Sequence, residues 1–252
     1  MISIKNLNLC FRGNNLLKNI NLKSDSNFLA VVGENGSSKS LFARSFIRLF
    51  DKGFKFSASE FIVDEIDVLE FKNLQSLRSK IAMLFQDARA SFHPLLDIGE
   101  HFNIVLKTHT NLSKKARKTL AFDLFERLNL KDADRIWHSF PAQLSSGISM
   151  RVQFALALAS KPKVLICDEI NANLDDENVR IIYELLSEFN NEGKKIILIS
   201  HDLEALNQLA DEVLVFENGA LVEQSKKYDF FQKPSSQSAK RLLEIYKALK
   251  CS

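Results

Sequence analysis

Polar and apolar positions alternate over the first 22 residues, a pattern typical of strands that bury one face. The apolar side chains are Ile2, Ile4, Leu7, Leu9 and Phe11, followed by a second set within residues 16–22. Between the two sets, residues 13–15 read Gly-Asn-Asn, which predicts a turn. The chain is therefore expected to begin with an antiparallel pair of strands.

Strand and helix patterns alternate in the rest of the chain, with a long helical block in the middle. Apolar runs predict strands at residues 28–32, 54–63, 81–85, 163–167, 196–199, 213–216 and 220–222, the last two flanking the hairpin signal Asn218-Gly219. Helical spacing predicts helices at 41–50, through most of 98–160, at 179–189, from 201 to 209 and at 236–250. This order predicts an α/β sheet with an inserted all-helical block.

Composition narrows the class of protein without identifying it. The 252 residues are 46% hydrophobic and 26% charged, which is ordinary for a globular chain with one substantial core. Because 34 Lys and Arg face 31 Asp and Glu, the net charge is only +3, and no nucleic-acid partner is predicted. Three separated cysteines favour a reducing cytoplasm. No apolar run approaches the ~20 residues that span a bilayer, so any membrane association is expected through partner chains.

The most informative motif lies between the strand predicted at 28–32 and the helix predicted at 41–50. It reads Gly33-Glu34-Asn35-Gly36-Ser37-Ser38-Lys39-Ser40. Such a loop wraps its backbone N–H groups around phosphate oxygens, and the N-terminus of the following helix adds partial positive charge. Lys39 is expected to reach the β- and γ-phosphates, and the Ser40 hydroxyl to bind Mg²⁺. The predicted nucleotide-binding residues are Gly33, Asn35, Gly36, Ser37, Ser38, Lys39, Ser40 and Leu41.

The second half of a nucleotide site is predicted at the end of the apolar run 163–167. Asp168 and Glu169 follow this run directly. Asp168 is expected to hold Mg²⁺ through water. The side chain of the adjacent Glu169 is expected to point the opposite way, where it could polarise an attacking water. An apolar run that ends in two acids is a weak signal alone, and it gains weight from Lys39 and Ser40 upstream.

A third motif decides the family that the chain resembles. Leu144-Ser145-Ser146-Gly147 opens a strong helical pattern. At this point the chain resembles the ATP-binding cassette (ABC) family, whose signature is Leu-Ser-Gly-Gly before a helix. The resemblance implies a P-loop NTPase (RecA-like) fold with a mixed sheet core, an antiparallel β subdomain and an inserted all-helical subdomain. It also implies that Ser145 and Gly147 close over ATP that is held by a second subunit.

Further residues match the family in its order along the chain. Gln86 stands where the family has a glutamine that senses Mg²⁺ and the membrane partner, and His201 where a histidine contacts the γ-phosphate. Asp175 conforms to the motif that spans residues 172–175, and Phe11 falls where an aromatic ring stacks on adenine. The resemblance therefore implies catalytic roles for Glu169, His201, Lys39 and Gln86, and metal-binding roles for Ser40, Gln86 and Asp168.

Within the family, residues 84–94 and 230–243 resemble the peptide and nickel importer branch. The resemblance implies an ATPase that uses ATP and Mg²⁺ on the cytoplasmic face of the cell membrane. Its implied partners are two transmembrane permease subunits, a second ABC ATPase, either identical or different, and, indirectly, a substrate-binding protein. Cys251 stands alone, so no iron–sulfur cluster is predicted, and His93, His101 and His109 are interpreted as structural.

Three departures from the family pattern leave an alternative open. Ser38 and Ser146 replace glycines, and Ile170 replaces a proline. A residue other than glycine loses about 1–2 kcal/mol of conformational energy when its φ is positive. If either serine needs a positive φ, the ATPase activity is therefore expected to be attenuated. The alternative is a binding-only regulatory subunit paired with an active ATPase; a soluble cassette acting in translation or DNA repair is a further rival. The predicted division is 1–94 with 161–225 for the nucleotide-binding core, 95–160 for the helical subdomain and 226–252 for a helical tail.

Overall fold

The computed structural model describes residues 1–171 and 174–250, and within these two sheets carry the fold. One sheet has the order β11-β10-β3-β9-β8-β7, and the other has the order β2-β1-β5-β6 with β4 also paired to β1. The strands are β1 Ile2–Phe11, β2 Asn14–Ser24, β3 Phe28–Gly33, β4 Phe54–Ser57, β5 Glu60–Val63, β6 Ile66–Asp67, β7 Ile81–Leu84, β8 Val164–Asp168, β9 Lys195–Ile199, β10 Glu212–Glu217 and β11 Ala220–Lys226.

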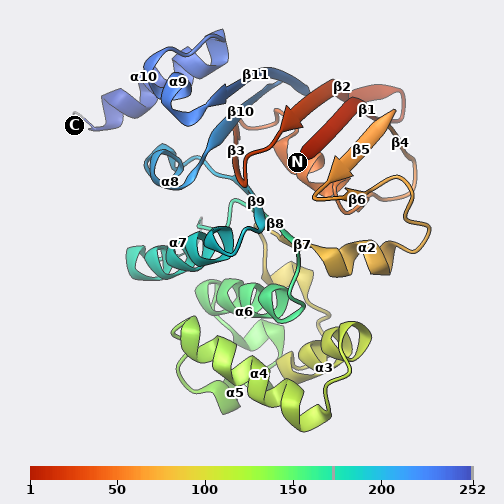
Figure 1. Cartoon of the computed structure of the whole chain (residues 1–252). Coiled ribbons are helices and arrows are strands. Elements are labelled where there is room, and N and C mark those ends of the chain that lie inside the picture. Colours follow the sequence, from red (N-terminus) through yellow and green to blue (C-terminus); the bar gives the residue numbers. More distant parts are fainter. Residues whose placement is uncertain (172–173, 251–252) are drawn as a thin grey trace.

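Helices cover these sheets and form a separate layer below them (Figure 1). Their bounds are α1 Lys39–Ser45, α2 Leu74–Lys80, α3 Ile98–His109, α4 Lys114–Arg127, α5 Ala133–His138, α6 Ser146–Ala159, α7 Asp176–Asn191, α8 Leu203–Leu209, α9 Lys227–Gln232 and α10 Gln237–Lys250, with short 3-10 turns η1 Arg89–Ser91 and η2 Pro141–Gln143. The first helix is shorter than the predicted 41–50, since α1 ends at Ser45 and turns follow.

The larger sheet is mixed, as predicted, and its parallel part positions the candidate site. β10, β3, β9, β8 and β7 run parallel, and only β11 is antiparallel. All residues of β3, β8 and β9 are buried, which explains their continuous apolar runs. Because the strands are parallel, the segments that follow β3, β9, β8 and β7 emerge at one edge of the sheet.

The smaller sheet corrects two predictions. The turn between β1 and β2 is Arg12-Gly13, both with positive φ, one residue earlier than predicted. Residues 54–63 form two strands instead of one, because β4 pairs with the end of β1 and β5 with its beginning. The positive φ of Asn6 lies between these two stretches and interrupts the regular register of β1.

The helical block predicted within 98–160 is confirmed as α3, α4, α5 and α6. Phe102 and Phe125 pack edge to face with ring centroids 5.4 Å apart, and Trp137 lies 5.9 Å from Phe102. Gly99 is required here, since a Cβ at this position would lie 2.4 Å from the Trp137 ring. Figure 1 shows the block below the larger sheet, with α6 next to the sheet.

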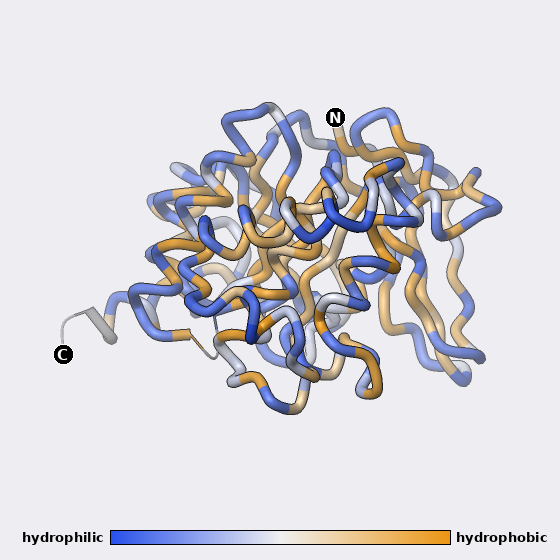
Figure 2. The backbone as a smooth tube through the Cα atoms, turned by 90° about the horizontal axis from the view of Figure 1, so that it is seen from below, coloured by the Kyte–Doolittle hydropathy of each residue, from blue (hydrophilic) through white to orange (hydrophobic). Residues whose placement is uncertain are grey.

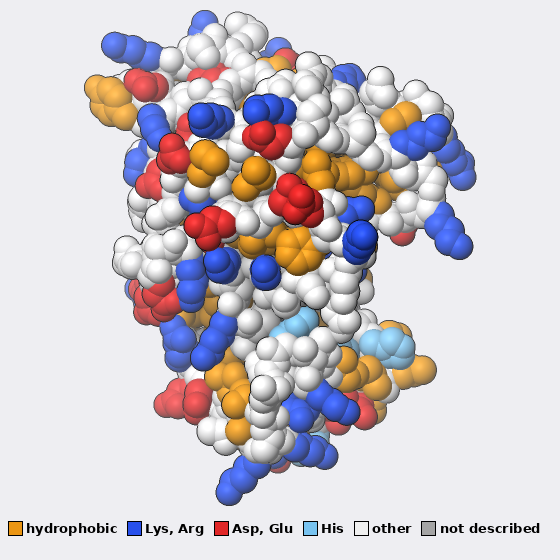
Figure 3. Space-filling view, turned by 45° about the vertical axis from the view of Figure 1, so that its right-hand side comes forward, with side chains coloured by type: hydrophobic (Ala, Val, Ile, Leu, Met, Phe, Trp, Pro, Cys, Tyr) orange, Lys and Arg blue, Asp and Glu red, His pale blue; other side chains and the backbone are white. Residues whose placement is uncertain are grey.

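Apolar side chains form one core on each side of the larger sheet. Phe28, Ala30 and Val32 of β3 belong to the core shared with the helical block, whereas Leu29 and Val31 belong to the core shared with the smaller sheet. In Figure 2 the strands inside the molecule are mostly hydrophobic and the peripheral turns mostly hydrophilic. On the face shown in Figure 3, basic and acidic side chains are interspersed. Within residues 1–171 and 174–250, no helix is long and apolar enough to cross a membrane.

Candidate functional site

The loop after β3 has the geometry expected of a phosphate cradle. Gly36 and Ser38 have φ of 79° and 73°, so the chain turns twice through the left-handed region before α1 begins at Lys39. The Lys39 Nζ donates hydrogen bonds to the carbonyl oxygens of Gly33 and Glu34 at 2.8 and 2.9 Å. The lysine side chain thus spans the loop from its helical end back to the strand.

Two features of the loop indicate room for an anionic ligand. The buried Ser37 Oγ has no hydrogen-bond partner, and such orphaned groups are rare in folded proteins. Gly36 is exposed, with nothing within 4 Å of the place where a Cβ would lie. Lys39 is only 5% exposed, and burial lowers its pKa while the nearby Glu169 and Asp168 oppose that shift. A buried cation with both loop carbonyls as its hydrogen-bond partners suits a phosphate ligand.

Ser40 and Asp168, predicted to bind Mg²⁺, lie together. The Ser40 Oγ donates a hydrogen bond to the Asp168 Oδ1 at 3.1 Å, although 128 positions separate the two residues. Desolvation raises the pKa of Asp168, and the Ser40 hydrogen bond, Arg44 and Lys39 oppose the shift. A hydroxyl and a buried carboxylate next to each other are oxygen ligands of the kind that Mg²⁺ prefers. The chemistry of this donor pair therefore fits the predicted ion.

Glu169 turns away from Asp168 and contacts two of the other three predicted catalytic residues. Its backbone has a φ of 51°, which directs the two adjacent carboxylates to different partners. The Gln86 Nε2 donates to the Glu169 Oε2 at 2.8 Å, and the His201 Nε2 lies 3.1 Å from the Oε1. The structure thus brings Gln86, Glu169 and His201 into one cluster at the ends of β7, β8 and β9.

A cavity of about 470 Å³ lies beside this cluster. Its lining includes Ser40, Gln86 and Asp168, and also Arg44 and Asp87. Arg44 was missed by the sequence analysis, although it lies one helical turn after Ser40 on α1, and that spacing predicts a shared face. The cavity gives a ligand at the loop direct contact with the residues predicted to bind metal.

Three more of the predicted residues lie at the starts of two other helices. Ser145 caps α6, where its Oγ accepts a hydrogen bond from the Ile148 N–H at 3.3 Å, and Gly147 lies in the first turn. Asp175 caps α7 and accepts from the Asn178 N–H at 2.9 Å. Ala172 and Asn173 of the same predicted motif lie outside the described residues. These two caps belong to other helices, as expected if they serve a second subunit.

Phe11, predicted to stack on adenine, already has an aromatic neighbour. Its ring stacks on Phe54 with centroids 4.5 Å apart, and the Arg12 guanidinium lies 5.1 Å from its centroid. The predicted role therefore stays a prediction. His101 accepts a hydrogen bond from the His93 N–H at 2.8 Å. Among the described residues, no three or more His, Cys, Asp or Glu side chains form a group that could hold a metal ion.

Comparison with known proteins decides the family. The profile of the family described as ABC transporter matches residues 17–172, which is more than half of the chain. The chain belongs to the ABC transporter family. This confirms the predicted family and the predicted P-loop α/β fold.

Three ABC proteins illustrate the similarity. The dipeptide transport ATP-binding protein DppD of Haemophilus influenzae is 34% identical over 85% of this chain, and the match spans 66% of that protein's length. The metal-staphylopine import system ATP-binding protein CntD of Staphylococcus aureus is 35% identical over 90% of this chain and 88% of its own. One solved structure is that of the dimeric ABC cassette MJ0796, in a post-hydrolysis state bound to ADP and Pi. It is 25% identical to this chain and superposes with a TM-score of 0.78, and the match covers 90% of this chain and 99% of that one.

The two serines that depart from the ABC pattern differ in backbone conformation. Ser38 has a φ of 73° and makes no capping hydrogen bond through its side chain, so the expected strain is present there. Ser146 is the first residue of α6 and has no positive φ. The backbone penalty therefore applies to one of the two positions only. Ile170, which stands in place of a proline, is buried in the core.

Proposed function

We propose that this chain is the ATP-hydrolysing subunit of an ABC importer for peptides or metal complexes. The observation that carries the proposal is the gathering of Lys39, the Ser40–Asp168 pair and the Gln86–Glu169–His201 cluster at one edge of the sheet. These side chains supply a cation for phosphate, oxygen ligands for a metal ion and a carboxylate for water. Gly33, Asn35, Gly36, Ser37, Ser38 and Leu41 are assigned to the loop that holds ATP.

Each residue has a role that its contacts support. Lys39 exchanges the carbonyl oxygens of Gly33 and Glu34 for phosphate oxygens when ATP binds. Glu169, held on one oxygen by Gln86, orients the attacking water and accepts its proton through the other. His201 stabilises the negative charge that develops on the transferred phosphoryl group. Bound Mg²⁺ neutralises phosphate charge, and Ser40, Asp168 and Gln86 are the residues assigned to hold it.

The proposal includes partners, because the chain holds only part of the site. Two helices other than the one that begins at Lys39 start at the predicted residues Ser145, Gly147 and Asp175. We assign these residues to the ATP bound by a second cassette, and the dimeric state of MJ0796 supports this assignment. Two transmembrane permease subunits and, through them, a substrate-binding protein complete the assembly at the cytoplasmic face of the membrane. The relatives named for dipeptide and metal-staphylopine transport support a peptide or a metal complex as cargo. Residues 95–160 form the helical subdomain in this proposal, and 226–252 the tail.

ATP turnover by the purified chain, alone and with its partner ATPase, tests the proposal against Glu169→Gln. We expect MgATP to bind to both forms and the substitution to lower kcat by about 10²–10⁴-fold. The binding-only alternative predicts binding without turnover in either form and either setting. Lys39, Glu169 and His201 are all present in the site, which favours the hydrolysing form over that alternative. Loss of MgATP binding in the unmodified chain would overturn both.

A further inference from the structure

A buried amide on α6 holds both ends of the segment that carries Gln86. We call residues 85–92 the Gln86 segment. The Gln153 Oε1 accepts a hydrogen bond from the Phe85 N–H at 3.0 Å, and its Nε2 donates to the Ser91 Oγ at 2.6 Å. Gln153 is only 6% exposed, so its amide is buried and both hydrogen bonds are partly shielded from water. Its position is buried among apolar residues of α6, where an unpaired amide would be costly.

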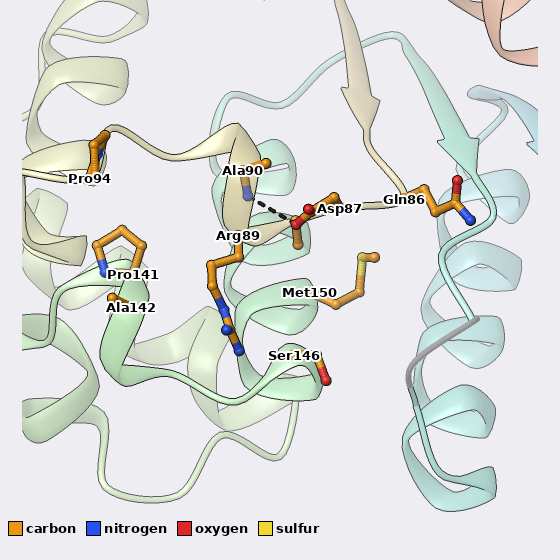
Figure 4. A pocket seen from close by; sticks show the side chains of 10 residues that line it. Gln86, Asp87, Arg89, Ala90, Pro94, Pro141, Ala142, Ser146 and Met150 are labelled. Carbon is orange, nitrogen blue, oxygen red and sulfur yellow. Dashed lines mark hydrogen bonds between the residues drawn. The ribbon is translucent and has the colours of Figure 1, made fainter.

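A second side chain joins the same segment to the start of α6. The Arg89 Nη2 donates to the Leu144 carbonyl at 2.8 Å, and Leu144 immediately precedes Ser145, the cap of α6. In Figure 4 the Arg89 side chain extends from the Gln86 segment towards the loop that leads into Ser146. The same figure shows the Asp87 carboxylate bound to the Ala90 N–H, a 3.0 Å contact that closes the turn.

These contacts connect two parts of the catalytic apparatus. The Gln86 segment places the Gln86 amide against Glu169. The N-cap of α6 is Ser145, which is assigned to the ATP of the second cassette. Gln153 joins the segment to the middle of α6, and Arg89 joins it to Leu144, directly before the cap of the same helix. A shift of either element therefore strains hydrogen bonds to the other. The hydrogen bonds of Gln153 resist such a shift because breaking them leaves a buried amide unpaired.

We propose that Gln153 is a positioning residue for hydrolysis, which acts by fixing Gln86 against Glu169 and by fastening the Gln86 segment to α6. The inference rests on the proposed function, since it assumes that Glu169 activates water. Gln153 lies outside the phosphate loop and contacts neither Lys39 nor Ser40 nor Asp168. Its loss should therefore affect the chemical step and spare the binding of MgATP.

The test is Gln153→Met in the full chain, which keeps the side-chain length and removes both hydrogen bonds. We expect kcat to fall about tenfold while the KM for MgATP stays within about twofold. Amide hydrogen exchange at Phe85 should become faster, because its N–H loses the Gln153 oxygen. Ser149→Ala is the matched control: Ser149 is buried on the same helix, and its Oγ has no hydrogen-bond partner. It should leave kcat and Phe85 exchange unchanged.

A double substitution separates positioning from a merely structural role. If Gln153 acts through Gln86, then Gln153→Met added to Gln86→Ala lowers kcat no further than Gln86→Ala alone. Independent, additive losses would overturn the inference, as would an unchanged kcat in Gln153→Met. If Gln153→Met does not fold, Ser91→Ala removes one of the two hydrogen bonds by a change at an exposed position. The kcat of Ser91→Ala, alone and combined with Gln86→Ala, then tests the inference in the same way.

The two proposals fail in different ways. Should the unmodified chain bind no MgATP, the proposed function fails, and the kinetic part of this inference fails with it. Should the unmodified chain hydrolyse ATP while Gln153→Met matches it in kcat, only the positioning role is wrong. Phe85 exchange is measured without nucleotide, so it reports on the hydrogen bond in either case.

Discussion

The side-chain amide of Gln86 donates a 2.8 Å hydrogen bond to the carboxylate of Glu169 across 83 positions of sequence. His201 occupies the other oxygen of the same carboxylate at 3.1 Å. The cluster therefore joins the segments that follow β7, β8 and β9. Each oxygen of an ionised carboxylate can accept a second hydrogen bond, so a water can reach Glu169 beside Gln86 and His201, both of which are exposed.

Removing His201 tests whether it contributes to catalysis or only holds Glu169. His201→Ala should lower kcat about hundredfold, because one source of stabilisation for the transferred phosphoryl group is lost. The Kd of MgATP should change less than about threefold, since Lys39 and the Ser40–Asp168 pair remain. Steady-state turnover and equilibrium binding measure the two effects. A kcat equal to that of the unmodified chain would exclude a catalytic role.

The two serines at family glycine positions should respond oppositely to glycine. Ser38→Gly relieves a left-handed conformation that costs about 1–2 kcal/mol, partly offset by about 0.4–1 kcal/mol of extra entropy in the unfolded chain. We expect the Tm to rise by about 1–4 °C. Ser146→Gly places glycine at the start of α6 and adds entropy to the unfolded chain, so it should lower stability by about 0.4–1 kcal/mol. Thermal unfolding of both variants measures this, and changes of the same sign would contradict the assignment of strain to Ser38.

We expect the stability of the folded protein to depend on pH through Asp168. Burial raises its pKa, so the folded protein holds this proton more tightly than the unfolded chain. Its contribution to stability is therefore present below the unfolded pKa of about 3.9 and is lost as pH rises through the higher folded value. At pH 7 the buried carboxylate opposes folding, and Asp168→Asn should raise the Tm.

The gain from Asp168→Asn should shrink as the pH falls through the raised pKa of the native carboxyl, because the native side chain then becomes protonated. Thermal unfolding at a series of pH values measures this trend. Asp123→Asn on the exposed surface of α4 serves as the control and should give little change at any pH. A Tm lower than that of the unmodified chain at pH 7 would show that Asp168 stabilises the fold.

Phe11 offers a test of the predicted adenine contact. Phe11→Ala should weaken ATP binding by about five- to hundredfold, the range for base stacking of about 1–3 kcal/mol, and leave binding of inorganic tripolyphosphate unchanged. Phe54→Ala removes the ring that stacks on Phe11 and controls for loss of local packing. Equal losses for ATP and tripolyphosphate would mean that Phe11 supports the fold and does not contact the base.

Local patterns predicted much of the fold because they depend on neighbours in sequence. The Asn218-Gly219 turn, with both φ values positive, and the β10–β11 hairpin follow from a two-residue signal. The Lys39 loop was predicted because its strand, glycines and helix are contiguous. The errors also arose locally: β4 and β5 look like one apolar run until β1 pairs with them separately.

The sequence by itself determined the candidates for the chemistry, since the order of Lys39, Gln86, Asp168 and His201 matches that of the ABC family. Only the tertiary structure decided which of them meet. Strand order β3-β9-β8-β7 places Gln86 beside Glu169, and no periodicity specifies which strands are neighbours. The hydrogen bonds of the buried Gln153 amide were equally invisible, because polar pairing depends on which distant segments pack around the side chain.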